Sequence, residues 1–322
     1  MRAAQVTRLD GPKAVQVTDV PDPLPGAGQV HIDVHAAGVT FPDVLLSRGR
    51  YQIKPDPPFV PGSEVAGVVR SAPEDSGLRP GDRVAAFPGF GGFAEQIAAD
   101  PRVVFPLPDR LSFEAGAGLP MNCLTVHFGL TRRGRLRPGE TVLVHGAAGG
   151  VGTAGVQLAA ALGARVIAVV SSDAKAETAR AAGAHETVPA DGFRQAVADL
   201  TAGRGVDLVL DPVGGDRFTD SLRSLAPEGR LLVVGFTGGE IPTVRVNRLL
   251  LNNIDVVGVG WGAYWLPRPE YLREQWQELL PHLEAGRLDP LIGETRPLDE
   301  AAEALSALDE RRATGKTVLR VR

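Results

Sequence analysis

Cysteine, lysine and aromatic residues are scarce in this chain of 322 residues, and it contains no long apolar run. The single cysteine, Cys123, excludes an internal disulfide and any zinc site built from paired thiolates, and it favours a reducing compartment. No window reaches the roughly 18 consecutive apolar residues that a membrane-spanning helix needs, and no apolar leader with a cleavage site follows Met1. We therefore expect a cytoplasmic protein that does not span a membrane.

A strong excess of charge of either sign is also absent. The sequence carries 34 Lys and Arg residues against 38 Asp and Glu residues, a net charge of -4, with the two signs interspersed. This balance argues against a nucleic-acid binder, because such proteins present a basic stripe to the phosphates. The hydrophobic share of 43% and the charged share of 22% are typical of globular proteins, and the length predicts two domains.

The pattern of expected elements changes near Glu140. Up to about residue 118, short β-rich runs alternate with glycine and proline, which predicts an irregular and mostly β domain. Beyond Glu140, strands alternate with helices, and this alternation predicts right-handed βαβ units around a parallel sheet. The strands are expected at 141–145, 165–170, 206–211, 229–236 and 254–259, before helices at 269–285 and 298–312. The periodicity leaves open which sheet a last strand, at 317–321, joins.

A glycine-rich turn follows the strand expected at 141–145. Gly146, Gly149 and Gly152 stand between this strand and an alanine-rich helix, where a tight turn lets the backbone approach a pyrophosphate at the positive end of the helix. The preceding strand, the following helix and the further βα units supply the context that such glycines alone lack. This predicts a dinucleotide site whose turn is formed by Gly146, Ala148, Gly149, Gly150, Val151 and Gly152.

The end of the next strand indicates which dinucleotide is bound. An NAD site usually carries Asp or Glu there, about 20 residues on, for the ribose hydroxyls. Here Val170 ends the strand and Ser171, Ser172 and Lys175 follow, a set that suits the 2′-phosphate of NADPH. Asp173 is the counter-evidence; we interpret it as the N-cap of the helix that contains Lys175, and the alternative is that it weakens the preference for NADPH.

Six motifs distributed along the chain extend the interpretation to its whole length. They are AAGVTFPD at 36–43, RGRY at 48–51, PGSEVAG at 61–67, GDRV at 81–84, the turn at 146–152 and TGKTV at 314–318. In these motifs the sequence resembles the zinc-free quinone oxidoreductase branch of the medium-chain dehydrogenase/reductase superfamily. The resemblance implies an α/β fold, with a doubly wound Rossmann sheet at 121–285 inserted in a GroES-like, mostly β domain made of 1–120 and 286–322. The last strand would then return to the first domain.

The same resemblance addresses metal binding. The catalytic zinc ligands of metal-dependent relatives fall at Thr40, Ser63 and Met121 of this sequence, and none of the three is a competent zinc ligand. Cys123 lies two residues from the last of these positions. The four-cysteine cluster that binds structural zinc in those relatives is also missing, so we expect no metal.

Without a metal, the hydride acceptor must already be electron-poor, as quinones and conjugated enones are. The protein then has to hold the nicotinamide against the acceptor, since the cofactor carries the hydride chemistry. The resemblance implies that Thr125 lies beside the nicotinamide ribose and ring, and that backbone groups near Phe236 contact the carboxamide. The alternative for Thr125 is a helix-surface hydroxyl that bonds locally.

The substrate side is also implied by the resemblance. Tyr51 matches a tyrosine at the cleft, where a phenol can hydrogen-bond a quinone oxygen or pass it a proton, although a core tyrosine remains the alternative. Asp43 either takes part in catalysis or caps a local turn. Phe41, which precedes Tyr51 in the same segment, is a further candidate at the cleft. Trp261, Tyr264 and Trp265 form an aromatic cluster after the strand expected at 254–259, and this cluster either stacks on a flat acceptor or packs between domains.

These expectations combine into an NADPH-dependent, zinc-independent reductase that transfers hydride to a quinone. An enoyl or 2-alkenal reductase is one alternative, and it would need a placed proton donor. An NADPH-binding protein with little turnover is another, because fold does not guarantee activity. We expect a small-molecule acceptor and no nucleic acid or membrane partner. The resemblance also implies a homodimer, because in family members the strand that corresponds to 254–259 pairs with its mate.

Overall fold

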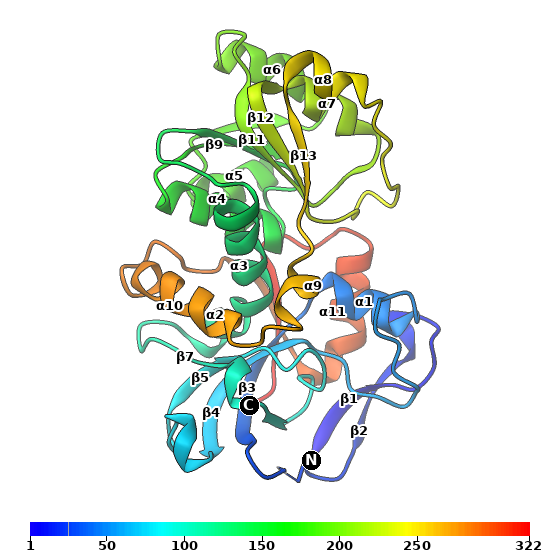
Figure 1. Ribbon diagram of the computed structural model, residues 1–322. Coiled ribbons are helices and arrows are strands. Elements are labelled where there is room, and N and C mark those ends of the chain that lie inside the picture. The colour runs from blue at the N-terminus through cyan, green and yellow to red at the C-terminus, as the bar shows by residue number, and fades with distance from the viewer. Residues whose placement is uncertain (25) are drawn as a thin grey trace. The chain divides into compact units, whose positions relative to one another are not determined.

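The structure of the protein is a computed structural model that describes residues 1–24 and 26–322. These residues form two compact units (Figure 1). The first contains Met1–Met121, Pro269–Glu284 and Asp289–Arg322, and the second contains Asn122–Arg268 and Ala285–Leu288. The chain therefore leaves the first unit after Met121 and returns to it from Pro269 onward, apart from Ala285–Leu288.

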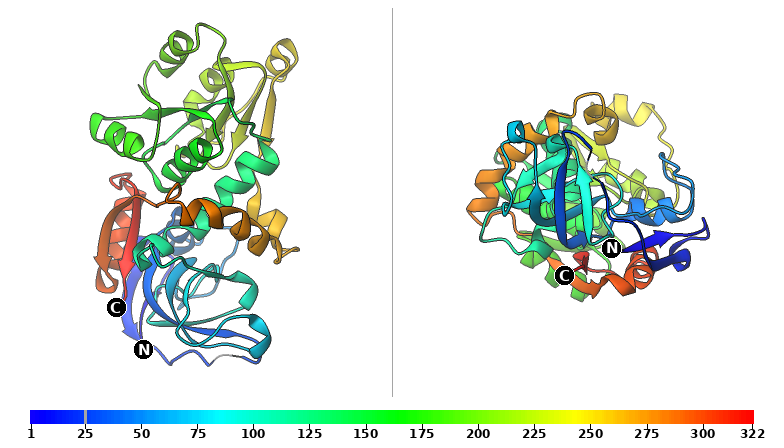
Figure 2. Two further views of the ribbon diagram at one scale, coloured as in Figure 1. Left: turned by 90° about the vertical axis from the view of Figure 1, so that its left-hand side faces the viewer. Right: turned by 90° about the horizontal axis from the view of Figure 1, so that it is seen from below.

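The first unit is built around a seven-stranded sheet with the order β14-β15-β3-β4-β5-β7, in which β6 also pairs with β3. The last strand, β15, pairs antiparallel with β3 through Val318 and Gly38, so it does return to the first domain. Both chain ends lie close together in this unit (Figure 2). The strands, including a separate β1–β2 pair, are β1 Arg2–Val6, β2 Val15–Asp19, β3 Val30–Gly38, β4 Glu64–Ser71, β5 Arg83–Ala86, β6 Gln96–Ala99, β7 Val104–Pro106, β14 Ile292–Pro297 and β15 Lys316–Arg320.

Helix α10, Tyr271–Glu284, groups with the first unit, although the sequence-based division placed residues 121–285 together. The reason is packing: the ring of Trp276 stacks on Phe105 at 4.7 Å, and its indole Nε1 donates to the carbonyl of Pro106 at 3.0 Å. The other helices of this unit are α1 Phe41–Ser47, α2 Phe113–Ala117 and α11 Ala301–Asp309, and α3 Pro120–His127 continues from the first unit into the second.

The second unit contains a six-stranded parallel sheet with the order β10-β9-β8-β11-β12-β13. The chain runs outward from β8 in one direction and from β11 in the other, so the order reverses between these two central strands. Ligands of doubly wound sheets bind at the carboxyl ends of the strands beside such a reversal. The strands are β8 Thr141–Val144, β9 Arg165–Val170, β10 Glu186–Pro189, β11 Val206–Asp211, β12 Leu225–Val233 and β13 Asp255–Gly258.

Apolar side chains from strands and helices fill the interior of the second unit. Leu143, Ile167 and Val209 come from central strands and pack with Phe193 and Leu222 of two helices. None of the helices in residues 1–24 and 26–322 is both long and apolar enough to cross a membrane. The helices of this unit are α4 Gly150–Ala161, α5 Asp173–Ala181, α6 Phe193–Leu200, α7 Phe218–Arg223, α8 Asn247–Asn252 and α9 Trp261–Trp265, with a π-helical turn at Phe128–Arg133.

Candidate active site

The glycine turn lies between β8 and α4, at the carboxyl end of a central strand. Gly146 has φ +58°, a left-handed conformation that glycine adopts without strain. A Cβ atom on Gly152 would lie 2.0 Å from the carbonyl oxygen of Gly146. The turn therefore folds back on itself so tightly that only glycine fits at its end.

The first turn of α4 presents hydrogen-bond donors that nothing in the described chain uses. The backbone N–H groups of Gly150, Val151 and Gly152 have no acceptor in the described residues, and the N-cap, Gly149, has no side chain to supply one. Free N–H groups at the positive end of a helix suit the oxygens of a pyrophosphate. Gly150 and Ala148, the latter buried, complete a turn whose residues fit a dinucleotide.

Asn122 lies against this turn, and the sequence analysis did not single it out. A Cβ on Gly150 would lie 2.6 Å from the amide Nδ2 of Asn122, so the two residues are neighbours. Asn122 is buried although it is polar. A buried amide within the mostly apolar run from 115 to 130 is the sequence signal that would have pointed to it.

The polar residues after β9 form one local cluster. The Lys175 ammonium donates to the Ser171 hydroxyl at 3.2 Å, and Ser172 Oγ accepts from the backbone N–H of Lys175 at 3.4 Å. Ser172 is thus the N-cap of α5, so the interpretation of Asp173 as the N-cap was wrong. The reason is conformational: Ser172 is the last extended residue, and Asp173 already belongs to the first helical turn, where its charge favours the helix dipole.

Phe236 lies in the loop that follows β12, beside the end of β11. The N–H of Val234 donates to the carbonyl of Asp211 at 3.0 Å, and the Asp211 carboxylate in turn accepts from the N–H of Gly214 at 2.9 Å. The carbonyl of Phe236 accepts from Gly239, whereas its own N–H has no acceptor in the part of the chain that the structure describes. A free backbone donor is therefore available at the carboxyl end of the sheet.

Thr125 lies in α3 with a half-buried side chain. Its hydroxyl makes no hydrogen bond to any described residue, unlike Thr131 nearby, whose hydroxyl donates to the carbonyl of His127 at 2.7 Å. The local hydrogen bond that was the alternative for Thr125 is thus not formed. The hydroxyl is free to bind a ligand.

The aromatic cluster of α9 contains one buried and one half-buried candidate. Trp261 is buried, and the ring of Tyr264 packs against Phe128 with ring centres 5.1 Å apart. The guanidinium groups of Arg132 and Arg268 lie 4.5 and 4.8 Å from the centre of the Tyr264 ring. These contacts fix the orientation of Tyr264 within its own unit.

In the first unit, Asp43 is completely buried in α1. Its carboxylate accepts from the N–H and the hydroxyl of Thr40, at 2.8 and 2.6 Å, and from the N–H of Gly62 at 3.0 Å. Burial raises the pKa of Asp43 to about 6, although these hydrogen bonds and the charge of Lys316 oppose the shift. The structure therefore assigns Asp43 to capping the helix and holding the segment at Gly62, and the carboxylate does not reach a surface.

Tyr51 follows α1 in the same unit, and Phe41 is the first residue of that helix; both side chains are half-buried. The phenol of Tyr51 forms no hydrogen bond to a described residue. Burial raises the pKa of Tyr51, and the charge of Asp43 raises it further, so the phenol is protonated at neutral pH. A protonated and unpartnered phenol can donate a hydrogen bond to an acceptor oxygen.

The three positions at which the resemblance expects the zinc ligands of metal-dependent relatives hold two hydroxyl side chains and a methionine. The hydroxyls of Thr40 and Ser63 lie 3.4 Å apart, and the N–H of Met121 donates to Glu64 at 2.7 Å. Glu64 also pairs with Lys316, whose ammonium donates to the carbonyl of Val39 at 2.9 Å. Within residues 1–24 and 26–322, no three His, Cys, Asp or Glu side chains lie close enough to hold a metal ion.

Comparison with known proteins identifies matches over the whole chain. Residues 26–109 match the alcohol dehydrogenase GroES-like domain, and residues 150–285 match the zinc-binding dehydrogenase family. The chain is 38% identical to quinone oxidoreductase-like protein 2 of Bos taurus, over 99% of this chain and 92% of that protein.

Solved structures give the same result. A probable oxidoreductase from Mycobacterium abscessus superimposes with a TM-score of 0.92 and 46% identity, over 100% of this chain and 99% of that one. The quinone oxidoreductase from Thermus thermophilus, solved also in its complex with NADPH, has a TM-score of 0.86 and 37% identity, with both chains covered completely.

The GroES-like unit and the parallel sheet with its glycine turn define a medium-chain dehydrogenase/reductase. Within this superfamily, the chain belongs to the quinone oxidoreductase family, which includes the quinone oxidoreductase-like proteins. The resemblance seen in the sequence motifs is thereby confirmed, and so is the predicted fold class.

Proposed function

We propose that the protein is an NADPH-dependent reductase that transfers hydride to a quinone. The observation that carries the proposal is the cluster after β9, where Lys175 and two serine hydroxyls surround a strand end that lacks a carboxylate. A carboxylate there would repel the 2′-phosphate, whereas an ammonium and hydroxyls bind it with charge-assisted hydrogen bonds. The NADPH complex of the Thermus thermophilus relative supports the same choice.

The turn residues would hold the cofactor. The free N–H groups of Gly150, Val151 and Gly152 bind the pyrophosphate, and the Thr125 hydroxyl and the N–H of Phe236 orient the nicotinamide end. Bound NADPH supplies the hydride that reduces the acceptor.

Tyr51 and Asp43 serve the acceptor in different ways. Reduction of a quinone to a hydroquinone by one hydride also consumes one proton, which an oxygen of the quinone takes up. The protonated phenol of Tyr51 donates a hydrogen bond to this oxygen. Asp43 is a positioning residue, because its three hydrogen bonds fix the segment that carries Phe41 and Thr40. Of the aromatic candidates in α9, the half-buried Tyr264 would contact a flat acceptor, whereas the buried Trp261 packs against Trp265.

The cofactor part is tested by fluorescence titration with NADPH and NADH. Lys175→Ala should weaken NADPH binding by about tenfold or more and leave NADH binding nearly unchanged, because only NADPH carries the 2′-phosphate. Lys13→Ala, a lysine in an exposed turn of the first unit, is the matched control. Equal losses for the two cofactors would remove this account of the phosphate site.

The reaction is tested by following NADPH oxidation with 1,4-benzoquinone, 9,10-phenanthrenequinone and an acyclic enone. Turnover of the quinones supports the proposal, and faster turnover of the enone supports an enone reductase instead. Tight NADPH binding without any oxidation would mean a binding protein.

Tyr51→Phe should lower kcat with the preferred acceptor, since it removes the hydroxyl but keeps the ring; unchanged kcat would contradict the role of Tyr51.

We also propose a cytoplasmic homodimer. β13 is an edge strand of its sheet, so it can pair with a strand of a second copy. The segment before it exposes four apolar side chains, whose burial in an interface would be favourable: Ile241, Val246, Leu250 and Leu251. Light scattering during gel filtration should give twice the chain mass of 33.9 kDa. Leu250→Lys should shift the species toward the monomer, and a monomeric wild type would contradict the proposal.

A further inference from the structure

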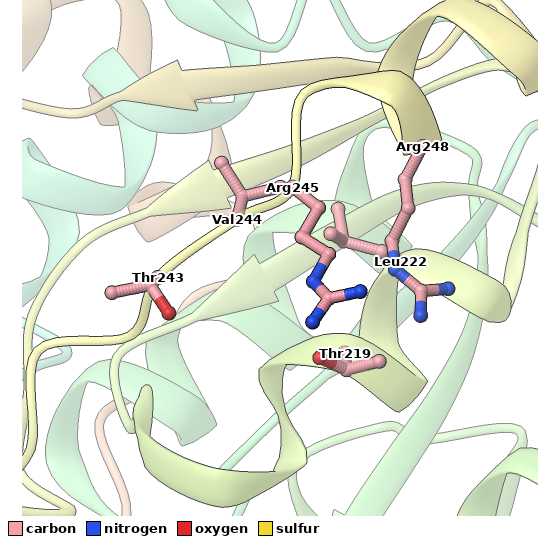
Figure 3. Close-up of a pocket in the computed structure, with 6 residues that line it drawn as sticks. All are labelled: Thr219, Leu222, Thr243, Val244, Arg245 and Arg248. Carbon is pink, nitrogen blue, oxygen red and sulfur yellow. The ribbon is translucent and has the colours of Figure 1, made fainter.

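A small cavity in the second unit is lined by residues of α7 and of the segment 243–248, none of which belongs to the proposed cofactor site. Its volume is about 140 Å³. Figure 3 shows the guanidinium groups of Arg245 and Arg248 turned toward Thr219 of α7. The cavity is lined by Thr219, Leu222, Thr243, Val244, Arg245 and Arg248.

The polar side chains of this cavity are donors without partners. Neither guanidinium forms an ion pair or a side-chain hydrogen bond with any residue in 1–24 or 26–322, and the hydroxyls of Thr219 and Thr243 form none either. No carboxylate lines the cavity. Two like charges that face one space repel each other unless an anion lies between them. The lining is thus rich in N–H and O–H donors and lacks a negative charge.

The segment that carries the arginines is anchored to the core. Leu222 belongs to the buried core cluster, and Val244 and Leu249 pack against the same cluster, on either side of the two arginines. The positions of the arginine backbones are therefore fixed before any ligand binds, which reduces the entropy lost on binding.

We propose that this cavity binds a phosphate group, as inorganic phosphate or as the monoester of a small metabolite. Phosphate supplies several acceptor oxygens and negative charge, and guanidinium groups bind it through paired N–H donors. The volume suits one such group, because it is well below the roughly 300 Å³ at which pockets for larger organic ligands begin.

The test is calorimetric titration at low salt with inorganic phosphate and, separately, with glycerol 1-phosphate. Lys175→Ala serves as the parent protein, so that phosphate loses the proposed 2′-phosphate contact of the cofactor site. Phosphate held by the turn at Gly150–Gly152 would be unaffected by the arginine substitutions, so only the binding that these substitutions change is assigned to the cavity. Arg245→Gln and Arg248→Gln should each weaken binding about threefold, and the double variant about tenfold, as expected for partly exposed ion pairs. Arg137→Gln is the matched control, because Arg137 is an exposed arginine of the same unit whose side chain has no partner in the described chain.

Either probe binding with this pattern supports the site, and the tighter probe identifies the source of the phosphate. Equal affinity of the double variant and its parent overturns the proposal, as does an equal loss in Arg137→Gln. If the parent binds neither probe, the proposal is wrong. Dissociation of the oligomer in the double variant would then indicate that an acidic side chain of a second copy occupies the cavity. Because no cofactor or quinone is present, the result is independent of the proposed reductase activity.

Discussion

The two units stabilise their interiors with different interactions. In the first unit, the fully buried Glu64 forms an ion pair with Lys316. The positive charge of Lys316 also favours the ionised form of Asp43, which is fully buried as well. In the second unit, the central sheet packs through apolar side chains, and its Arg230–Glu140 pair lies where Glu140 is partly exposed. The first unit joins strands from both ends of the chain, whereas the second repeats consecutive βα elements. Charged contacts therefore hold together the unit whose segments are far apart in the sequence.

The second unit also buries a titratable group, but keeps it neutral. Ser221 donates its hydroxyl proton to the carbonyl of Arg217 at 3.0 Å, so it accepts from Nε2 of His145 at 2.8 Å. Burial lowers the pKa of His145 to about 4, which leaves the imidazole uncharged at neutral pH. The buried ring packs edge-on against Phe193.

The largest expected effect comes from breaking the ion pair of the first unit. Lys316→Met should lower the free energy of unfolding by about 4 kcal/mol, because it leaves the Glu64 carboxylate buried without its counter-charge. Urea denaturation measures the loss. Adding Glu64→Gln to this variant should restore part of the stability, and Lys54→Met, at a solvent-exposed lysine, should cost little. A loss below about 1 kcal/mol for Lys316→Met would show that the pair does not stabilise the unit.

In the second unit, the matching test is a substitution that creates a cavity in the apolar core. Leu143→Ala removes a fully buried side chain from the central strand and should cost about 3 kcal/mol. Because no charge is involved, the loss should be the same at low and high salt in denaturation curves. A marked salt dependence would contradict the contrast between the two interiors.

The pH dependence of stability should have opposite signs in the two units. The folded pKa of Asp43, about 6, lies above its unfolded value of 3.8, so its contribution is present below pH 4 and is lost as pH rises through 6, by at most about 3 kcal/mol. The folded pKa of His145, about 4, lies below its unfolded value of 6.5, so its contribution is present above pH 6.5 and is lost as pH falls through 4.

Unfolding free energies measured from pH 4 to 8 separate the two contributions. The stability difference between wild type and Asp43→Asn should shrink as pH rises, and the difference between wild type and His145→Gln should grow. If the two stability differences changed with pH in the same direction, the direction of the pKa shift given for Asp43 or for His145 would be wrong.

The smallest expected effect concerns the helix cap after β9. Ser172→Ala should cost about 1 kcal/mol of stability, because it removes the oxygen that accepts from the N–H of Lys175. Thermal unfolding detects this loss, and Asp173→Asn should change stability less, since Asp173 is not the cap. The reverse ranking would restore Asp173 as the N-cap.

Periodicity and turn chemistry predicted the second unit well. The strand at 165–170 has the predicted bounds, and the glycine turn lies between β8 and α4 as expected. The expected strand at 229–236 begins earlier, at Leu225, and ends at Val233. The short strand β10 was not expected, because only Val188 of its four residues is buried and it ends at Pro189. Local patterns are most reliable where each element buries a continuous apolar run.

The site was predictable to different degrees. The glycine turn and the serine–lysine cluster are contiguous in sequence, so their pattern was visible. Two other contacts could not be seen in the sequence: the packing of Asn122 against Gly150, and the hydrogen bond from the N–H of Gly62 to the carboxylate of Asp43. Each joins residues many positions apart. The choice of Ser172 over Asp173 as the cap depended on one backbone conformation, which residue type alone does not determine.

The sequence by itself determined the fold class, the position of the dinucleotide turn and the family, because these follow from periodicity, glycine spacing and local motifs. Only the tertiary structure decided which polar groups are buried and what they contact: the bond from Gly62 to Asp43, the Glu64–Lys316 pair, the neutral His145 and the two arginines that face one cavity. The physical reason is that burial, charge pairing and unsatisfied hydrogen bonds are properties of groups brought together from distant segments, and no local pattern records that proximity.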